Sequence, residues 1–150
     1  MLGIDHINLV VNDLKAMTAF YETALEMKVT KRVTISGEWI DEVVGLKGAR
    51  GDVVYLELPT GPRIELIRYH SPAAPPHQIH AANAFGIRHI AFRVDGIDAL
   101  VDRLRAAGVK FFSAVQDVPD SQVTYASGVK KRLVYFRDPE GNILELCEYR

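Results

Sequence analysis

The feature that most constrains this sequence is a segment that occurs twice. Residues 63–69 (RIELIRY) are repeated, with small changes, at residues 144–149 (LELCEY). A shift of 80 positions aligns these identical pairs: Val54 with Val134, Tyr55 with Tyr135, Pro59 with Pro139, Gly61 with Gly141, Glu65 with Glu145, Leu66 with Leu146 and Tyr69 with Tyr149. Similarity at a fixed shift indicates an internal duplication, so the chain is predicted to contain two copies of one module.

A second match lies upstream of each copy. A shift of 83 positions aligns GIDHI at residues 3–7 with GIRHI at residues 86–90. Each copy therefore carries one histidine and one glutamate at similar separations, 59 residues from His6 to Glu65 and 56 from His89 to Glu145. We expect the difference of three residues to lie in a loop.

Composition favours a soluble globular protein that forms one domain. The chain has 150 residues, of which 48% are hydrophobic and 25% charged. A net charge of −1 argues against a nucleic-acid partner, and the densest basic run, residues 130–132, is interpreted as a solvated loop. There is no basic leader and no run of about 18 apolar residues, so we expect neither a signal peptide nor a membrane span, and a cytoplasmic location. The single cysteine, Cys147, cannot form an internal disulfide.

The first module is predicted to span residues 3–69 with the element order βαβββ. Residues 4–11 favour a strand, and Asn12 or Asp13 can cap the helix that follows. Further strands are predicted at residues 29–35, 53–58 and 63–69, with a long connection rich in turns at residues 37–51.

The second module is predicted to span residues 86–150, after a proline-rich linker at residues 70–85. A strand at residues 87–94 precedes a helix that ends at Gly108. Strands are expected at residues 109–115, 132–137 and 142–149, and Asp138-Pro139-Glu140-Gly141 turns the last two into a hairpin. The fold class is therefore α+β.

Strand alternation separates two faces in each module. Residues such as Ile64 and Leu66 point toward the helix, which leaves the repeated polar residues together on the other face. That face is predicted to carry these residues: His6, Asn8, Tyr55, Glu65 and Tyr69 in the first module, and His89, Arg93, Tyr135, Glu145 and Tyr149 in the second.

The repeated histidines and glutamates suggest a metal site. Burial of an unpaired carboxylate or imidazole costs roughly 1–3 kcal/mol, so four such groups on half-apolar strands require partners or a cation. His6, Glu65, His89 and Glu145 would give a mixed nitrogen and oxygen ligand set suited to one divalent ion, Ni²⁺, Co²⁺, Zn²⁺, Mn²⁺ or Fe²⁺. The alternative is that His6–Glu65 and His89–Glu145 are hydrogen-bonded core pairs.

These segments resemble the vicinal oxygen chelate superfamily, which includes glyoxalase I, methylmalonyl-CoA epimerase, extradiol dioxygenases and drug-resistance proteins. The matching motifs are DHI at 5–7, IEL at 64–66, RHIAF at 88–92, DPEGN at 138–142 and LEL at 144–146. The resemblance covers nearly the whole chain. It implies two βαβββ modules that form a curved mixed sheet around a metal-binding cleft, with the two His and two Glu residues as ligands.

The resemblance also implies a reaction class. In this superfamily the metal binds two neighbouring substrate oxygens and stabilises an enolate or oxyanion. The leading hypothesis is a metal-dependent lyase or isomerase of the glyoxalase I or epimerase type, in which Glu145, with Glu65 opposite, moves a proton next to a metal-bound carbonyl. Asn8, Tyr55, Arg93 and Tyr135 are the candidate substrate-binding residues.

Two alternatives remain open from the sequence. An extradiol ring-cleaving dioxygenase would use two histidines and one carboxylate on Fe²⁺, and Glu65, as a fourth ligand, argues against it. A non-catalytic small-molecule or drug-binding protein would use the same cleft, lined by the repeated tyrosines. The resemblance further implies a small-molecule substrate with vicinal oxygens and a homodimer. It does not distinguish a metal site within one chain from one shared across a swapped dimer, nor whether glutathione or coenzyme A is used.

Overall fold

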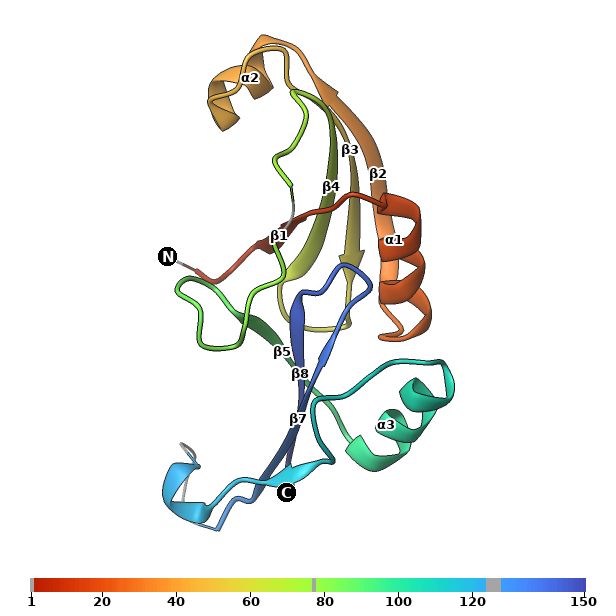
Figure 1. Cartoon of the computed structure of the whole chain (residues 1–150), viewed down its shortest axis with the longest axis vertical. Coiled ribbons are helices and arrows are strands. Elements are labelled where there is room, and N and C mark those ends of the chain that lie inside the picture. Colours follow the sequence, from red (N-terminus) through yellow and green to blue (C-terminus); the bar gives the residue numbers. More distant parts are fainter. Residues whose placement is uncertain (1, 77, 124–127) are drawn as a thin grey trace. The chain divides into compact units, whose positions relative to one another are not determined.

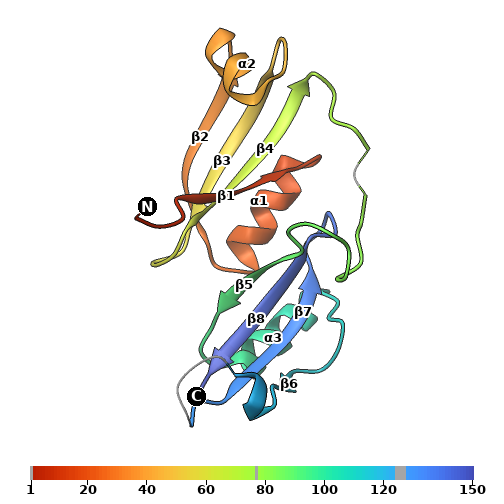
Figure 2. The same cartoon turned by 90° about the vertical axis from the view of Figure 1, so that its left-hand side faces the viewer.

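The computed structural model describes residues 2–76, 78–123 and 128–150. The chain divides into two compact units, unit 1 (Met1–Gln78) and unit 2 (Ile79–Arg150), whose elements are labelled in Figures 1 and 2. The boundary falls within residues 70–85, the segment that the sequence predicts as a linker.

Unit 1 is a four-stranded mixed sheet with two helices. Its elements are β1 (His6–Val10), α1 (Leu14–Thr23), β2 (Lys28–Ser36), α2 (Glu38–Val44), β3 (Arg50–Glu57) and β4 (Arg63–Ser71). The strand order is β1-β4-β3-β2. Strand β1 runs parallel to β4, whereas the other neighbours are antiparallel.

Unit 2 repeats this plan. Its elements are β5 (His89–Arg93), α3 (Ile97–Ala106), β6 (Gln116–Asp117), the short 3₁₀ helix η1 (Asp120–Gln122), β7 (Lys131–Arg137) and β8 (Ile143–Tyr149). The strand order is β5-β8-β7-β6, with β5 parallel to β8. The α+β class and the pair of βαβββ modules predicted from the sequence are confirmed.

The strand register follows the internal repeat residue by residue. Asn8 lies opposite Glu65 in unit 1, and Ala91 lies opposite Glu145 in unit 2. Tyr55 is paired with Glu65 as Tyr135 is with Glu145. The shifts of 80 and 83 positions therefore identify residues that occupy equivalent places in the two sheets.

Each sheet buries one face against its helix. In unit 1, α1 packs on β3 and β4, and Met17, Tyr21 and Leu66 are fully buried there. In unit 2, α3 packs on β8, with Leu104 and Leu146 almost without exposure. Figure 1 shows each helix beside its own sheet. The opposite face of each sheet carries the repeated histidine and glutamate.

Three expectations from the sequence are wrong in detail. Residues 37–51 contain helix α2, which Ile40 anchors because its side chain is only 6% exposed. Residues 109–115 form no strand; Phe111 makes an isolated bridge with Phe136, and its ring stacks against that core residue. The edge strand is instead β6, two residues long. Strand β4 also continues beyond Tyr69 to Ser71.

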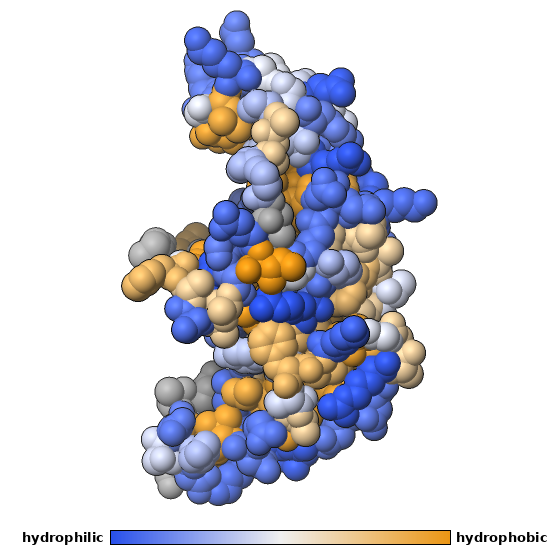
Figure 3. Space-filling model, in the orientation of Figure 1, coloured by the Kyte–Doolittle hydropathy of each residue, from blue (hydrophilic) through white to orange (hydrophobic). Residues whose placement is uncertain are grey.

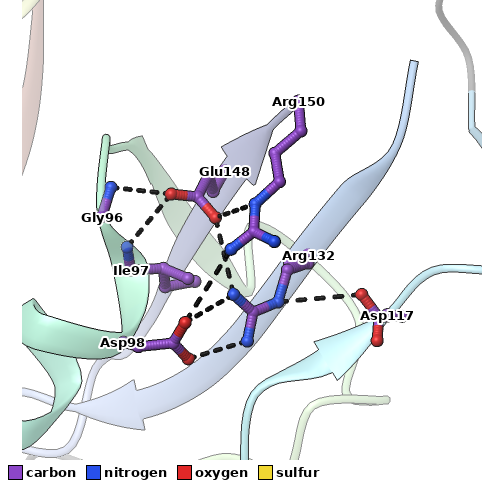
Figure 4. Close-up of polar contacts among 7 residues, drawn as sticks. All are labelled: Gly96, Ile97, Asp98, Asp117, Arg132, Glu148 and Arg150. Carbon is purple, nitrogen blue, oxygen red and sulfur yellow. Dashed lines mark hydrogen bonds and ion pairs between the residues drawn. The ribbon is translucent and has the colours of Figure 1, made fainter.

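The two module helices begin in different ways. Asp13 caps α1 locally, since its Oδ1 accepts a hydrogen bond from the Ala16 N–H at 2.9 Å. Helix α3 follows Gly96, which has no side chain, and its first N–H groups donate instead to Glu148 on β8: Gly96 N at 2.7 Å and Ile97 N at 3.2 Å. Figure 4 shows this carboxylate between the helix start and Arg150.

In the view of Figure 3, apolar areas alternate with hydrophilic ones, and one apolar patch lies over α2. Trp39, Val43 and Leu46 are the exposed large apolar residues of that helix and the turn after it. Among the described residues, no helix is long and apolar enough to cross a membrane.

Candidate functional site

Unit 1 brings the predicted ligands His6 and Glu65 into contact. Parallel pairing of β1 with β4 places both side chains on the face away from α1. His6 Nε2 lies 3.4 Å from Glu65 Oε2, and His6 Nδ1 lies 2.8 Å from a carboxylate oxygen of Asp5. The Asp5 contact orients the imidazole so that Nε2 faces the glutamate. Glu65 is only 8% exposed, so its carboxylate depends on partners for stabilisation.

Two neutral groups support Glu65. The Tyr55 hydroxyl donates a hydrogen bond to Oε1 at 2.5 Å, and the Asn8 amide donates one to Oε2 at 3.0 Å. The hydrogen bond to Glu65, together with burial, raises the pKa of Tyr55 to about 12. Tyr55 therefore stays protonated and remains a donor at neutral pH.

Unit 2 contains the equivalent pair. His89 Nε2 lies 3.3 Å from Glu145 Oε2, which matches the contact in unit 1. Glu145 is 3% exposed, and the ring of Tyr135 lies 5.1 Å from the His89 ring, centroid to centroid. Burial raises the pKa of Tyr135, and the negative charge of Glu145 raises it further.

A cation lies beside Glu145 in addition to the phenol of Tyr135, and Ala91 takes the place of the Asn8 amide. Lys131 Nζ lies 3.2 Å from Glu145 Oε1, and the lysine side chain is 22% exposed. Among the described residues, that buried oxygen accepts no well-aligned hydrogen bond. Burial tends to lower the pKa of Lys131, but Glu145 and Tyr149 oppose this, and the pKa lies above its ordinary value. Lys131 is therefore an ammonium ion at neutral pH.

Lys131 lies outside the set of site residues that the sequence predicts. The basic run at residues 130–132 favours a solvated loop, but Lys131 begins β7 and lies opposite Tyr149. Strand alternation from Tyr135, four residues later, places Lys131 on the same face, and that signal could have identified it. A run of basic residues hides this alternation, because Arg132 in the same run points to the opposite face toward Glu148.

The predicted residues thus form two clusters, one in each unit. His6, Asn8, Tyr55 and Glu65 are in contact in unit 1. His89, Tyr135 and Glu145 are in contact in unit 2, and Arg93 lies further along the same face, over the ring of Tyr149. Within either unit, the described residues include no group of three His, Cys, Asp or Glu side chains placed to hold a metal, so each unit by itself offers one histidine–glutamate pair.

The fold is a duplication of one βαβββ unit. In each copy, a histidine on the first strand faces a glutamate on the fourth, which gives one candidate ligand pair per copy. Comparison with known families identifies this fold. Residues 3–146 match the model of the Glyoxalase/Bleomycin resistance protein/Dioxygenase superfamily. The chain belongs to this superfamily.

The chain is also similar to individual proteins over nearly its whole length. The chain is 32% identical to the uncharacterized protein YaeR of Escherichia coli K12, with 99% of each chain covered. It is 28% identical to YwbC of Bacillus subtilis, also uncharacterized, over 97% of this chain and 96% of that protein. Among solved structures, a glyoxalase family protein from Bacillus cereus has a TM-score of 0.82 and 30% identity, covering 99% of this chain and 95% of that one.

Proposed function

We propose that this protein is a metal-dependent lyase or isomerase of the glyoxalase I or epimerase type. The observation that carries the proposal is the repeated contact between a histidine Nε2 and a glutamate Oε2, at 3.4 Å in unit 1 and 3.3 Å in unit 2. Both carboxylates are buried, and both come from equivalent positions of the duplicated fold. We propose that His6, Glu65, His89 and Glu145 together bind one divalent ion.

The distance within each His–Glu pair is compatible with two ligands of one ion. Ligands about 2.0–2.2 Å from a shared metal are separated from each other by roughly 3.0–3.5 Å, a range that includes both His–Glu distances. Two imidazole nitrogens and two carboxylate oxygens suit Ni²⁺, Co²⁺, Zn²⁺, Mn²⁺ or Fe²⁺. Oε1 of Glu145 has the Lys131 ammonium 3.2 Å away, so Oε2, which faces His89, is the oxygen that we assign to the ion.

The proposed chemistry is proton transfer beside a carbonyl. A bound divalent ion supplies Lewis-acid stabilisation of the oxyanion when two neighbouring oxygens of a small substrate bind it. Glu145, or Glu65, accepts the proton from the adjacent carbon and returns it. Tyr55 holds Glu65 through a hydrogen bond to Oε1, whereas the Lys131 ammonium lies beside Oε1 of Glu145.

Metal content and proton exchange test the proposal. Protein purified without chelator should contain one divalent ion per chain, and it should catalyse exchange of the α-proton of a 2-oxo or 2-oxoacyl substrate with solvent deuterium. Glu145→Gln should lose exchange. Glu57→Gln is the matched control, because Glu57 is a β3 carboxylate that is held by the Thr30 hydroxyl at 3.2 Å and is not a proposed ligand. Absence of stoichiometric metal would refute the proposed site.

Oxygen uptake separates the proposal from ring-cleaving chemistry. Extradiol dioxygenases bind Fe²⁺ through two histidines and one carboxylate, which leaves positions for catechol and O₂. The second carboxylate of this chain, Glu65, favours the lyase or isomerase assignment. Catechol-dependent oxygen consumption by the iron-loaded protein would contradict it. Tight binding of a small molecule that survives loss of the metal in His6→Ala would instead support sequestration.

A further inference from the structure

Two of the positions at which the units differ lie on the face that carries the His–Glu pairs. Near the end of β8, Lys131 lies opposite Tyr149, and Arg93 lies opposite Cys147. At the same places in unit 1, Gly51 lies opposite Tyr69, and Val10 lies opposite Ile67. Unit 2 therefore carries two cations where unit 1 carries a glycine and a valine.

Both cations of unit 2 lie over one aromatic ring. The Arg93 Cζ is 5.4 Å and the Lys131 Nζ 5.6 Å from the centroid of the Tyr149 ring. Each positive group is attracted to this ring by a cation–π interaction, and the two come from the strands on either side of β8. Among the residues that the structure describes, Arg93 has no carboxylate partner, and its side chain is exposed. Its planar donors are therefore open to an oxyanion from solvent.

Backbone geometry prevents unit 1 from building the same pair. The ladder between β3 and β4 is irregular at Arg50 and Gly51. A Cβ atom at Gly51 would lie 2.9 Å from the Arg68 carbonyl oxygen, which no real side chain tolerates without a shift of the backbone. A lysine equivalent to Lys131 is therefore excluded there. The difference at this one position is therefore built into the backbone of the two sheets.

We propose that Arg93 and Lys131 bind an oxyanion group of the substrate, a carboxylate or a phosphate, so that unit 2 recognises the charged end of the molecule. The inference rests on the proposed function only in assigning this face of the sheet to the substrate. Arg93 offers a planar fork that matches two oxyanion oxygens, and Lys131 offers a point charge. Lys131 is also 3.2 Å from Glu145 Oε1, so the bound oxyanion would lie next to a proposed ligand and base.

Glu145 competes for the same lysine in the protein without metal. Because its carboxylate pairs with Lys131, Arg93 should provide the larger share of oxyanion binding in that state. A divalent ion bound to Glu145 would partly neutralise the carboxylate, so that Lys131 would be held less strongly by it and could bind the oxyanion. Oxyanion affinity should therefore rise when Zn²⁺ is added.

Nuclear magnetic resonance titration of the full chain tests the inference. The protein is treated with chelator, dialysed, and titrated separately with acetate, inorganic phosphate and uncharged acetamide. Acetate or phosphate should cause saturable shifts at the Arg93 Nε–H and at the amides of Lys131 and Tyr149, and acetamide should not. Arg93→Gln should weaken the binding about tenfold, the usual effect of removing one charge-assisted hydrogen bond. Lys131→Gln should abolish the gain from Zn²⁺.

Arg68→Gln is the matched control, since it removes an exposed arginine from β4 of unit 1. It should leave the titration unchanged. Equal affinity in Arg93→Gln and the unmodified protein, or shifts that never saturate, would overturn the inference. A stronger response to phosphate than to acetate would identify a phosphate group, and the reverse a carboxylate. Oxyanion binding without metal binding would refute the proposed function and leave this site standing, whereas metal binding without oxyanion binding would refute this site alone.

Discussion

Units 1 and 2 share a strand register and a His–Glu contact, but they surround the glutamate with different chemistry. In unit 1, Glu65 accepts hydrogen bonds from a phenol and an amide, both neutral. In unit 2, Glu145 lies beside the ammonium group of Lys131. Both copies keep the contact between a histidine and a glutamate, whereas the groups around the glutamate differ in charge. We infer that the His–Glu pairs, which both units share, bind the metal. The groups around each glutamate, which differ between the units, would orient the substrate and tune proton transfer.

The largest expected effect tests the shared part. Glu65→Gln and Glu145→Gln should each weaken divalent metal binding by more than about 100-fold, because loss of a ligand exceeds the 10–100-fold effect of losing a group that only orients one. Competition with a chromophoric chelator measures both affinities. If one substitution leaves the affinity unchanged, the two carboxylates are not equivalent, and a site with two histidines and one carboxylate becomes the better description.

A second substitution tests the cation that only unit 2 places beside its glutamate. Lys131→Gln removes the cation beside a buried carboxylate and should lower the free energy of unfolding of the metal-free protein by about 1–3 kcal/mol. The same change should tighten metal binding, because Lys131 no longer competes for Glu145. Denaturant unfolding and chelator competition give the two quantities. A lower free energy of unfolding together with a higher metal affinity would support this role. A general structural role would lower both quantities.

Much of this comparison could be predicted from the sequence, because its signals are local or periodic. The repeat identified the equivalent residues, and alternation placed Tyr55 and Glu65 on one face, as the hydrogen bond between them confirms. Helix α2 and the two-residue strand β6 could not be predicted in this way. Their positions depend on tertiary contacts, such as burial of Ile40, that leave no clear period in a short segment.

The polar partners were harder to predict than the fold. Glu148 looks like one more charged residue of a strand, yet its carboxylate receives the N–H groups at the start of α3, about fifty residues earlier in the chain. Lys131 was obscured by its basic neighbours. Both assignments need the cross-strand register and the position of the helix, which follow from packing of the whole unit.

Tyr55→Phe should have a smaller effect than Lys131→Gln. It removes one hydrogen bond to Glu65, but the Asn8 amide still donates to the other oxygen at 3.0 Å. We expect the free energy of unfolding to fall by about 1 kcal/mol and metal affinity to change little. Tyr135→Phe in unit 2 is the matched variant. A loss of metal affinity in Tyr55→Phe comparable to that in Glu65→Gln would show that the phenol takes a direct part in the site.

The smallest expected effect concerns how the two module helices begin. Glu148 receives the N–H groups of Gly96 and Ile97, whereas Asp13 caps α1 from within its own turn. Burial alone would raise the pKa of Glu148, but the Ile97 and Gly96 N–H groups and Arg150 lower it by more. Because the folded pKa lies below the unfolded value near 4.5, this group stabilises unit 2 above about pH 4.5, and the contribution is lost as the pH falls through the folded pKa.

Glu148→Gln should therefore flatten the acid limb of the stability profile. The amide oxygen of glutamine can still accept from Gly96 and Ile97, but its NH2 group then stands where Arg150 and Arg132 need an acceptor, so stability at neutral pH falls as well. Between about pH 7 and pH 3, the variant should lose less stability than the unmodified protein. Thermal unfolding and hydrogen exchange of the α3 amides measure this. Glu42→Gln, an exposed position on α2, is the control. If both variants show the unmodified acid limb, helix α3 does not depend on the charge of Glu148, and the two helix starts are equivalent in acid.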